Sequence, residues 1–122
     1  MPRTTLEEAR LHPAIRETVA NLNADIVYNV QAAANSNPVL VVGMAGNPHV
    51  RRARKALDGA GFGYHYLEYG SYFGGWRRRT ALKMWTGWPT FPMVFVKGTL
   101  VGGADELERL VTGGELKRTL GE

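Results

Sequence analysis

The chain has 122 residues, of which 44% are apolar and 10% aromatic, and it contains no cysteine. This composition predicts one folded domain and excludes disulfides, a catalytic thiol and an iron–sulfur cluster held by the chain's own thiolates. The formal net charge is +4; residues 1–37 carry three arginines and four acids, so the rest of the chain carries +5, a balance that favours an acidic partner.

Neither a secretion signal nor a membrane span is visible in the sequence. Charged and polar residues follow Met1-Pro2 without an apolar stretch, so no signal peptide is predicted. No apolar run reaches the roughly 18 to 20 residues that cross a bilayer. We therefore expect a cytoplasmic protein with no membrane partner.

Residues 1–36 are expected to form a helical extension. Thr5-Leu6-Glu7-Glu8 has the spacing of a capping box and predicts a short helical turn, which Pro13 interrupts. One longer helix is predicted from Pro13 to about residue 34. Its apolar side chains recur at helical intervals as Ile15, Val19, Leu22, Ile26 and Val30. This stripe is expected to pack on the core, with a homodimer contact through the N-terminal helix as the alternative.

Residues 37–122 are expected to form the main domain. The run 35–38 ends the helix at a proline, and the continuous apolar run 39–42 predicts a strand buried on both faces. Asn47 suits a helix N-cap and Pro48 a first helical residue, so a helix is predicted over 48–59. Residues 64–68 alternate as in a strand.

The second half of this domain begins with a loop of glycines and aromatic residues at 69–75. A helix over 76–85 follows, then strands over 91–96 and 99–101 around the turn Lys97-Gly98. Two closing helices are predicted over 104–111 and 115–120. This order predicts an α/β protein with three αβα layers, a four-stranded mixed sheet and an extra N-terminal helix.

Three short motifs follow one another in this domain. They are Asn37-Pro38-Val39, Trp88-Pro89-Thr90-Phe91-Pro92, and Gly102-Gly103-Ala104-Asp105. In this order, over about residues 35–120, they resemble the glutaredoxin family, and the second motif is most similar to its monothiol branch. The resemblance implies a thioredoxin-like fold and a groove that binds glutathione.

The resemblance also implies a role for each part of that groove. Pro92 would follow a cis peptide bond, so that the backbone before it pairs with an extended peptide. The helix start at Ala104 would hold the γ-glutamyl carboxylate, and Asp105 the ammonium group. Arg79 and Lys83 would hold the glycine carboxylate. The candidate ligand-binding residues are Asn47, Pro48, His49, Arg79, Lys83, Thr90, Phe91, Pro92, Gly102, Gly103, Ala104 and Asp105.

The sequence departs from the family pattern where the chemistry is concentrated. Asn47 and Val50 stand at the positions of the nucleophilic and resolving cysteines, and Met44 stands where the family has a lysine. Neither Asn47 nor Val50 can form a mixed disulfide, so disulfide reductase activity is disfavoured. Asn47 is interpreted as a helix cap, with a contact to a glutathione sulfur as the alternative.

Most of the remaining charged side chains are expected to be exposed to solvent. The basic residues Arg51, Arg52, Arg54 and Lys55 are expected to form a solvated face, with a patch for an acidic partner as the alternative. One arginine of the run 77–79 is expected at the groove and two in water. The three histidines lack the spacing of metal ligands, so no metal site is predicted, and nucleic-acid binding is not expected.

The sequence thus predicts a glutaredoxin-like protein without catalytic cysteines. It would bind glutathione, or an extended acidic peptide of a protein partner, as a regulator, sensor or adaptor in glutathione physiology. No cofactor is required, and glutathione is the candidate ligand. Two alternatives stay open: a glutathione-dependent transferase or carrier in which glutathione supplies the thiol, and an interaction module with a vestigial groove.

Overall fold

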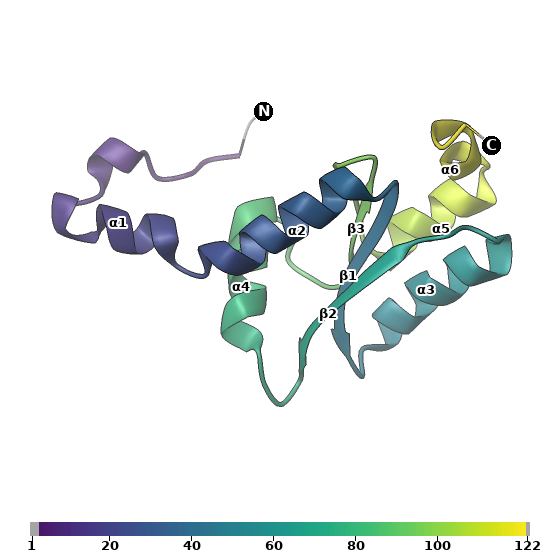
Figure 1. Ribbon diagram of the computed structural model, residues 1–122, viewed down its shortest axis with the longest axis horizontal. Helices are drawn as coiled ribbons and strands as arrows, with labels where there is room; N and C mark the ends of the chain where they lie inside the picture. Colours follow the sequence, from purple (N-terminus) through teal and green to yellow (C-terminus); the bar gives the residue numbers. More distant parts are fainter. Residues whose placement is uncertain (1–2, 122) are drawn as a thin grey trace.

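The computed structural model describes residues 3–121, and its centre is a four-stranded mixed sheet (Figure 1). The strands are β1 (Val39–Ala45), β2 (His65–Ser71), β3 (Met93–Val96) and β4 (Thr99–Gly102), in the order β2-β1-β3-β4. β1 runs parallel to β2 and antiparallel to β3, and β3 and β4 form the predicted hairpin. The mixed sheet expected from the sequence is confirmed.

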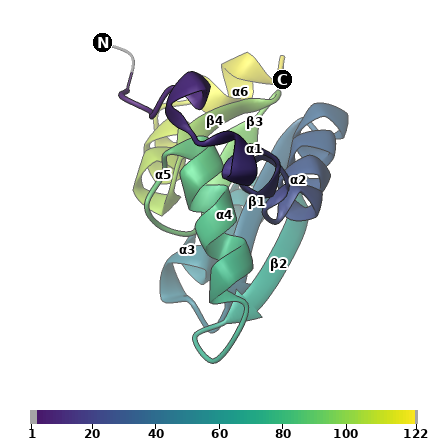
Figure 2. The ribbon, with the colours of Figure 1, turned by 90° about the vertical axis from the view of Figure 1, so that its left-hand side faces the viewer.

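Helices cover both faces of the sheet, as predicted. α2 (Ala24–Ser36) and α4 (Trp76–Thr86) pack on one face, and α3 (Pro48–Ala60), α5 (Ala104–Thr112) and α6 (Glu115–Thr119) pack on the other. Figure 2 shows α4 in front of the sheet with α3 and α5 on its far side. All but α2 begin where the sequence predicts, and they end within one or two residues of the predicted ends.

The apolar run of β1 supplies side chains to two cores. Leu40 and Val42 belong to the core under α2 and α4, whereas Val39 and Val41 belong to the core under α3 and α5. All four are at most 1% exposed. Because neighbouring strand residues point to opposite faces, a continuous apolar run is what a central strand covered on both sides requires.

The single helix predicted from Pro13 to about residue 34 is wrong in one respect. A short 3-10 turn, η1 (Glu8–Arg10), is followed by two helices, α1 (Pro13–Asn21) and α2, and Asn23 between them is left-handed with φ 49°. Asparagine is one of the few residues that adopt this conformation without glycine's freedom, so the chain can turn there. The apolar period continues across the break, which is why periodicity alone did not reveal it.

The two halves of the apolar stripe differ in burial. Ile26, Val30 and Ala34 of α2 are buried in the core, as expected of a packed helix. None of the nine residues of α1 is buried, and Figure 1 shows α1 projecting beyond the sheet. The expectation of core packing is therefore right for α2 and wrong for α1. The domain boundary after residue 36 stays a prediction, and α2, which precedes it, contributes to the core of the sheet domain.

Gly43 lets the start of α3 approach the sheet closely. A Cβ atom on Gly43 would lie 2.7 and 2.9 Å from the two Cγ atoms of Val50, closer than real side chains come. This approach fixes the position of Asn47, whose Oδ1 accepts hydrogen bonds from the backbone N–H groups of His49 (2.8 Å) and Val50 (3.2 Å). The predicted N-cap is confirmed. Within residues 3–121 no helix combines the length and apolarity needed to cross a membrane.

Candidate ligand-binding groove

Three segments meet at one edge of the sheet around a pocket of about 250 Å³. β1 ends and β3 begins at this edge, because the two strands are antiparallel and Val42 pairs with Met93. The pocket therefore lies between the start of α3, the loop that leads into β3, and the start of α5. It is lined by His49, Arg52, Trp88, Thr90, Phe91, Pro92, Gly103, Ala104, Asp105 and Glu106.

The loop before β3 forms one wall of the pocket. The peptide bond between Phe91 and Pro92 is cis, as the resemblance implied, and the strand starts only at Met93, two residues later than predicted. Phe91 and Pro92 are buried, while Thr90 is exposed. Trp88 also lines the pocket, and its Nε1 is buried without a hydrogen-bond partner among residues 3–121.

The start of α5 forms the opposite wall. Gly102 has φ 125°, and a Cβ atom there would lie 2.6 Å from Cγ of Glu106, so only glycine fits. Gly103 N–H donates to Oε1 of Glu106 at 2.9 Å, which satisfies one of the free donors of the helix end. The N–H groups of the first turn have no intrahelical acceptor, so this end of α5 can hold an anion.

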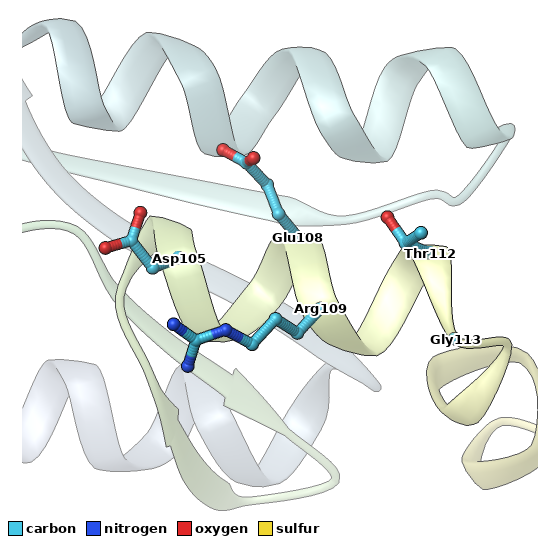
Figure 3. A pocket seen from close by; sticks show the side chains of 5 residues that line it. All are labelled: Asp105, Glu108, Arg109, Thr112 and Gly113. Atoms are coloured by element: carbon cyan, nitrogen blue, oxygen red, sulfur yellow. The ribbon is translucent and has the colours of Figure 1, made fainter.

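An ion pair crosses the rim of the pocket between α3 and α5. The guanidinium of Arg52 donates to Oδ1 of Asp105 and also pairs with Glu108. Figure 3 shows Glu108 pointing from α5 toward α3, and Arg109 running back along α5 toward the end that carries Asp105. The adjoining hollow of about 440 Å³ is lined by Asp105, Glu108, Arg109, Thr112 and Gly113 and lacks the cis-proline wall, so we take the smaller pocket as the candidate site.

Comparisons with known proteins identify the family. None of the known protein-family models matches the chain. A glutaredoxin-like protein from Dictyostelium discoideum is 45% identical over 102 residues, which cover 84% of this chain and 83% of that protein. The chain belongs to the glutaredoxin family.

Solved structures agree with this assignment. A crystal structure of a buckwheat glutaredoxin–glutathione complex matches the present glutaredoxin with a TM-score of 0.70 and 27% identity, covering 83% of this chain and 92% of the buckwheat chain. The thioredoxin-like fold is therefore confirmed. Glutaredoxin 3 of Danio rerio is 50% identical over 42 residues, and the match covers only 13% of that longer protein.

The structure brings most of the predicted site residues together, but Arg79 is not among them. Arg79 is 7% exposed, and its Nη1 donates to the carbonyl oxygens of Tyr69 (3.1 Å) and Gly74 (2.8 Å). Lys83 lies beside the groove without lining it, with Nζ 5.8 Å from the centroid of the Phe91 ring. Arg79 is the one member of the arginine run that is buried, and it holds the loop between β2 and α4.

The other two arginines of the run lie on the surface of this glutaredoxin. Arg78 pairs with Asp25 of α2 at 2.8 Å, and the Arg77 guanidinium lies 5.3 Å from the centroid of the Trp76 ring. The expected division, one arginine at the groove and two in water, is therefore wrong for the groove member. Arg79 is used within the chain: it donates to the Tyr69 carbonyl and is a second donor to the Gly74 carbonyl, which also accepts from Ser71 N–H.

Three residues that line the pocket, Arg52, Trp88 and Glu106, are absent from the predicted site residues. Arg52 is expected on a solvated basic face; its side chain is 43% exposed, but it also lines the pocket and pairs with two carboxylates of α5. Its spacing gave a usable signal: Arg52 follows His49 by three residues on α3, so both lie on one helical face near the cap.

Arg54 is also engaged, which reduces the free positive charge of α3. Its guanidinium lies 4.0 Å from the centroid of the Tyr66 ring, and Nε donates to the Tyr64 hydroxyl at 3.2 Å. Burial, with a hydrogen bond to Glu68, raises the pKa of Tyr66 to about 12. Of the four basic residues of the predicted face, Arg51 and Lys55 are the ones exposed without such a contact within residues 3–121.

Proposed function

We propose that this glutaredoxin-like protein binds glutathione, or an extended peptide of a protein partner, in the groove and acts as a regulator, sensor or adaptor. The observation that carries the proposal is the meeting of the backbone at Thr90–Pro92 with the start of α5 around one pocket of about 250 Å³. This pocket belongs to a chain with no cysteine. Binding without thiol–disulfide exchange by the chain is the function that agrees with both facts.

The charges around the pocket suit the amino-acid end of glutathione. That end carries a carboxylate and an ammonium group on the same carbon. Asp105 would accept from the ammonium, while Arg52 and the N–H groups at Ala104 would donate to the carboxylate. Met44 cannot supply the cation that its family position usually provides, because it is an apolar side chain buried in the core. Arg52, on the neighbouring wall, supplies a positive charge in its place.

The rest of the ligand would lie along the cis-proline wall. An extended peptide would add to the backbone before Pro92 as a short strand, through main-chain hydrogen bonds. Lys83, beside Phe91, is the nearest candidate for the glycine carboxylate. Arg79 is left out of this proposal because its guanidinium is bonded to two loop carbonyls.

The test is a titration of reduced glutathione up to about 10 mM, followed by backbone amide shifts in nuclear magnetic resonance spectra. We expect saturable shifts at residues 47–50, 90–92 and 103–105, and at least tenfold weaker binding for Asp105→Ala, the cost of about 1.4 kcal/mol. Arg109→Ala is the matched control, since Arg109 is a charged residue of the same helix that does not line the pocket. A flat titration would exclude glutathione as the ligand and leave only the partner peptide.

A further inference from the structure

Five exposed apolar side chains lie outside the groove, on α1, at its C-cap and on α4. We name this set the arm face and define it by Ile15, Val19, Leu22, Trp76 and Met84. Their exposed fractions are 46%, 49%, 59%, 61% and 67%. Figures 1 and 2 show α1 beyond the edge of the sheet, on the same side of the molecule as α4. An apolar surface of this extent on a small protein indicates an interface.

The arm face contains both a ridge and a hollow. Ile15 and Val19 lie one helical turn apart on α1 and form the ridge. A hollow of about 200 Å³ lies between the C-cap of α1 and α4, lined by Leu22, Asn23, Trp76, Arg77, Thr80, Ala81 and Met84. In a two-fold dimer the same patch meets itself, so each copy must present a projecting part and a receiving part. The arm face has both parts, the ridge and the hollow.

The helix α1 needs a packing partner to be stable. It has nine residues, and isolated helices shorter than about 12 to 15 residues are marginal in water. None of those nine residues is buried against the rest of the chain. The turn at Asn23 directs α1 away from the core that buries α2, so a surface from another molecule would have to cover its apolar stripe.

We propose that the arm face is a homodimer interface, in which the Ile15–Val19 ridge of each copy occupies the hollow of the other. The area is sufficient. At roughly 150–250 Å² for a large side chain, these exposures give on the order of 500 Å² of apolar surface per copy. A standard interface buries about 800 Å² per partner, of which about 65% is apolar in homodimers.

The charge distribution favours a second copy over an acidic partner. Each copy carries a net charge of +4, so two copies can meet only where few charges lie. Of the described residues that form the arm face or line its hollow, Arg77 is the charged one, and it lies over the Trp76 ring. An acidic partner would instead be drawn to exposed cations such as Arg51 and Lys55. The arm face shares no residue with the groove pocket, so this inference does not depend on the proposed function.

The test is sedimentation velocity of the full chain over a concentration series from about 1 to 200 µM. We expect a reversible species of twice the 13.5 kDa chain mass. Val19→Glu and Met84→Lys should each weaken dimerisation at least tenfold, while Tyr28→Glu should not, although Tyr28 is an equally exposed apolar residue outside the arm face. Both variants should stay folded, because the altered side chains lie outside the core. Their helical circular dichroism should fall by no more than the contribution of the nine residues of α1, which lose their packing partner in the monomer.

A mixing experiment tests the reciprocal pairing itself. An equimolar mixture of Val19→Glu and Met84→Lys should form dimers more tightly than either variant alone, because the introduced charges then meet across the interface. A monomer at every concentration, an equal effect of Tyr28→Glu, or a mixture no tighter than the separate variants would each overturn the proposal.

Discussion

A substitution of the buried Arg79 tests whether this residue stabilises the loop between β2 and α4 or binds a ligand. The change we consider is Arg79→Met, which keeps an unbranched side chain and removes the donors to Tyr69 and Gly74. Each hydrogen bond from a charged donor contributes about 1.5–3 kcal/mol, offset in part by the cost of burying the charge. The Gly74 oxygen also accepts from Ser71 N–H at 3.0 Å, so one of its two bonds survives. We expect the free energy of unfolding to fall by roughly 2–3 kcal/mol.

The assay is urea denaturation followed by tryptophan fluorescence. With a slope of about 1–2 kcal/mol per M, the expected loss of stability lowers the midpoint of unfolding by about 1–3 M urea. Arg77→Met is the matched control on the same helix, because Arg77 is exposed. Its free energy of unfolding should change by less than about 0.5 kcal/mol. If Arg79→Met unfolds like the unmodified chain and instead loses affinity for glutathione, the structural argument is refuted and Arg79 is a ligand residue.

Two further predictions concern Asn47 and Tyr66. Asn47→Cys places a thiol at the start of α3, where the helix end lowers the pKa of a thiol below its usual 8.5; it should be modified by glutathione disulfide at least tenfold faster than the distant, exposed Asn35→Cys, as followed by mass spectrometry. Equal rates would mean that the groove does not deliver glutathione. Because the pKa of Tyr66 is about 12 when folded and about 10 when unfolded, the unfolded tyrosine ionises first. Stability should be complete below pH 10 and decline as pH rises toward 12, and Tyr66→Phe should reduce this decline in denaturation measured at pH 8, 10 and 11.

Most of the fold could be predicted because local signals and tertiary packing agree. The apolar run of β1, the cap at Asn47 and the hairpin at Lys97-Gly98 each have one favourable structure. The break at Asn23 could not be predicted, because the apolar period passes through it unchanged. Asparagine at that position permits a turn but does not require one.

The candidate site was predictable in its backbone and less so in its charged side chains. The glycines and Pro92 have conformations that the main chain dictates, so a motif places them correctly. Arg52 and Arg79 have long side chains whose partners depend on packing between helices and on which carbonyl groups a loop leaves free. The sequence predicts that Arg79 binds the ligand and that Arg52 is solvated. In the structure Arg79 is bonded to two loop carbonyls, and the half-exposed Arg52 pairs with carboxylates of α5.

The cap at Asn47 also determines whether the start of α3 can bind the sulfur of glutathione. In a helix start that stabilises a thiolate, the first N–H groups are free to face the sulfur. Here the N–H groups of His49 and Val50 both donate to Oδ1 of Asn47, a neutral acceptor within the chain. A bound glutathione would therefore gain little from its thiol, and its affinity would come from the peptide backbone and the two charged ends.

An analogue of glutathione in which a methyl group replaces the thiol measures this directly. We expect its dissociation constant, from the same amide titration, to lie within about threefold of that of glutathione, a difference of less than about 0.7 kcal/mol. Asn47→Ala, which frees both N–H groups at a cost of about 1 kcal/mol in stability, should then bind glutathione more tightly than the analogue. An analogue that binds the unmodified chain more than tenfold more weakly would show that the sulfur is recognised, and would favour the glutathione-dependent enzyme over the binding protein.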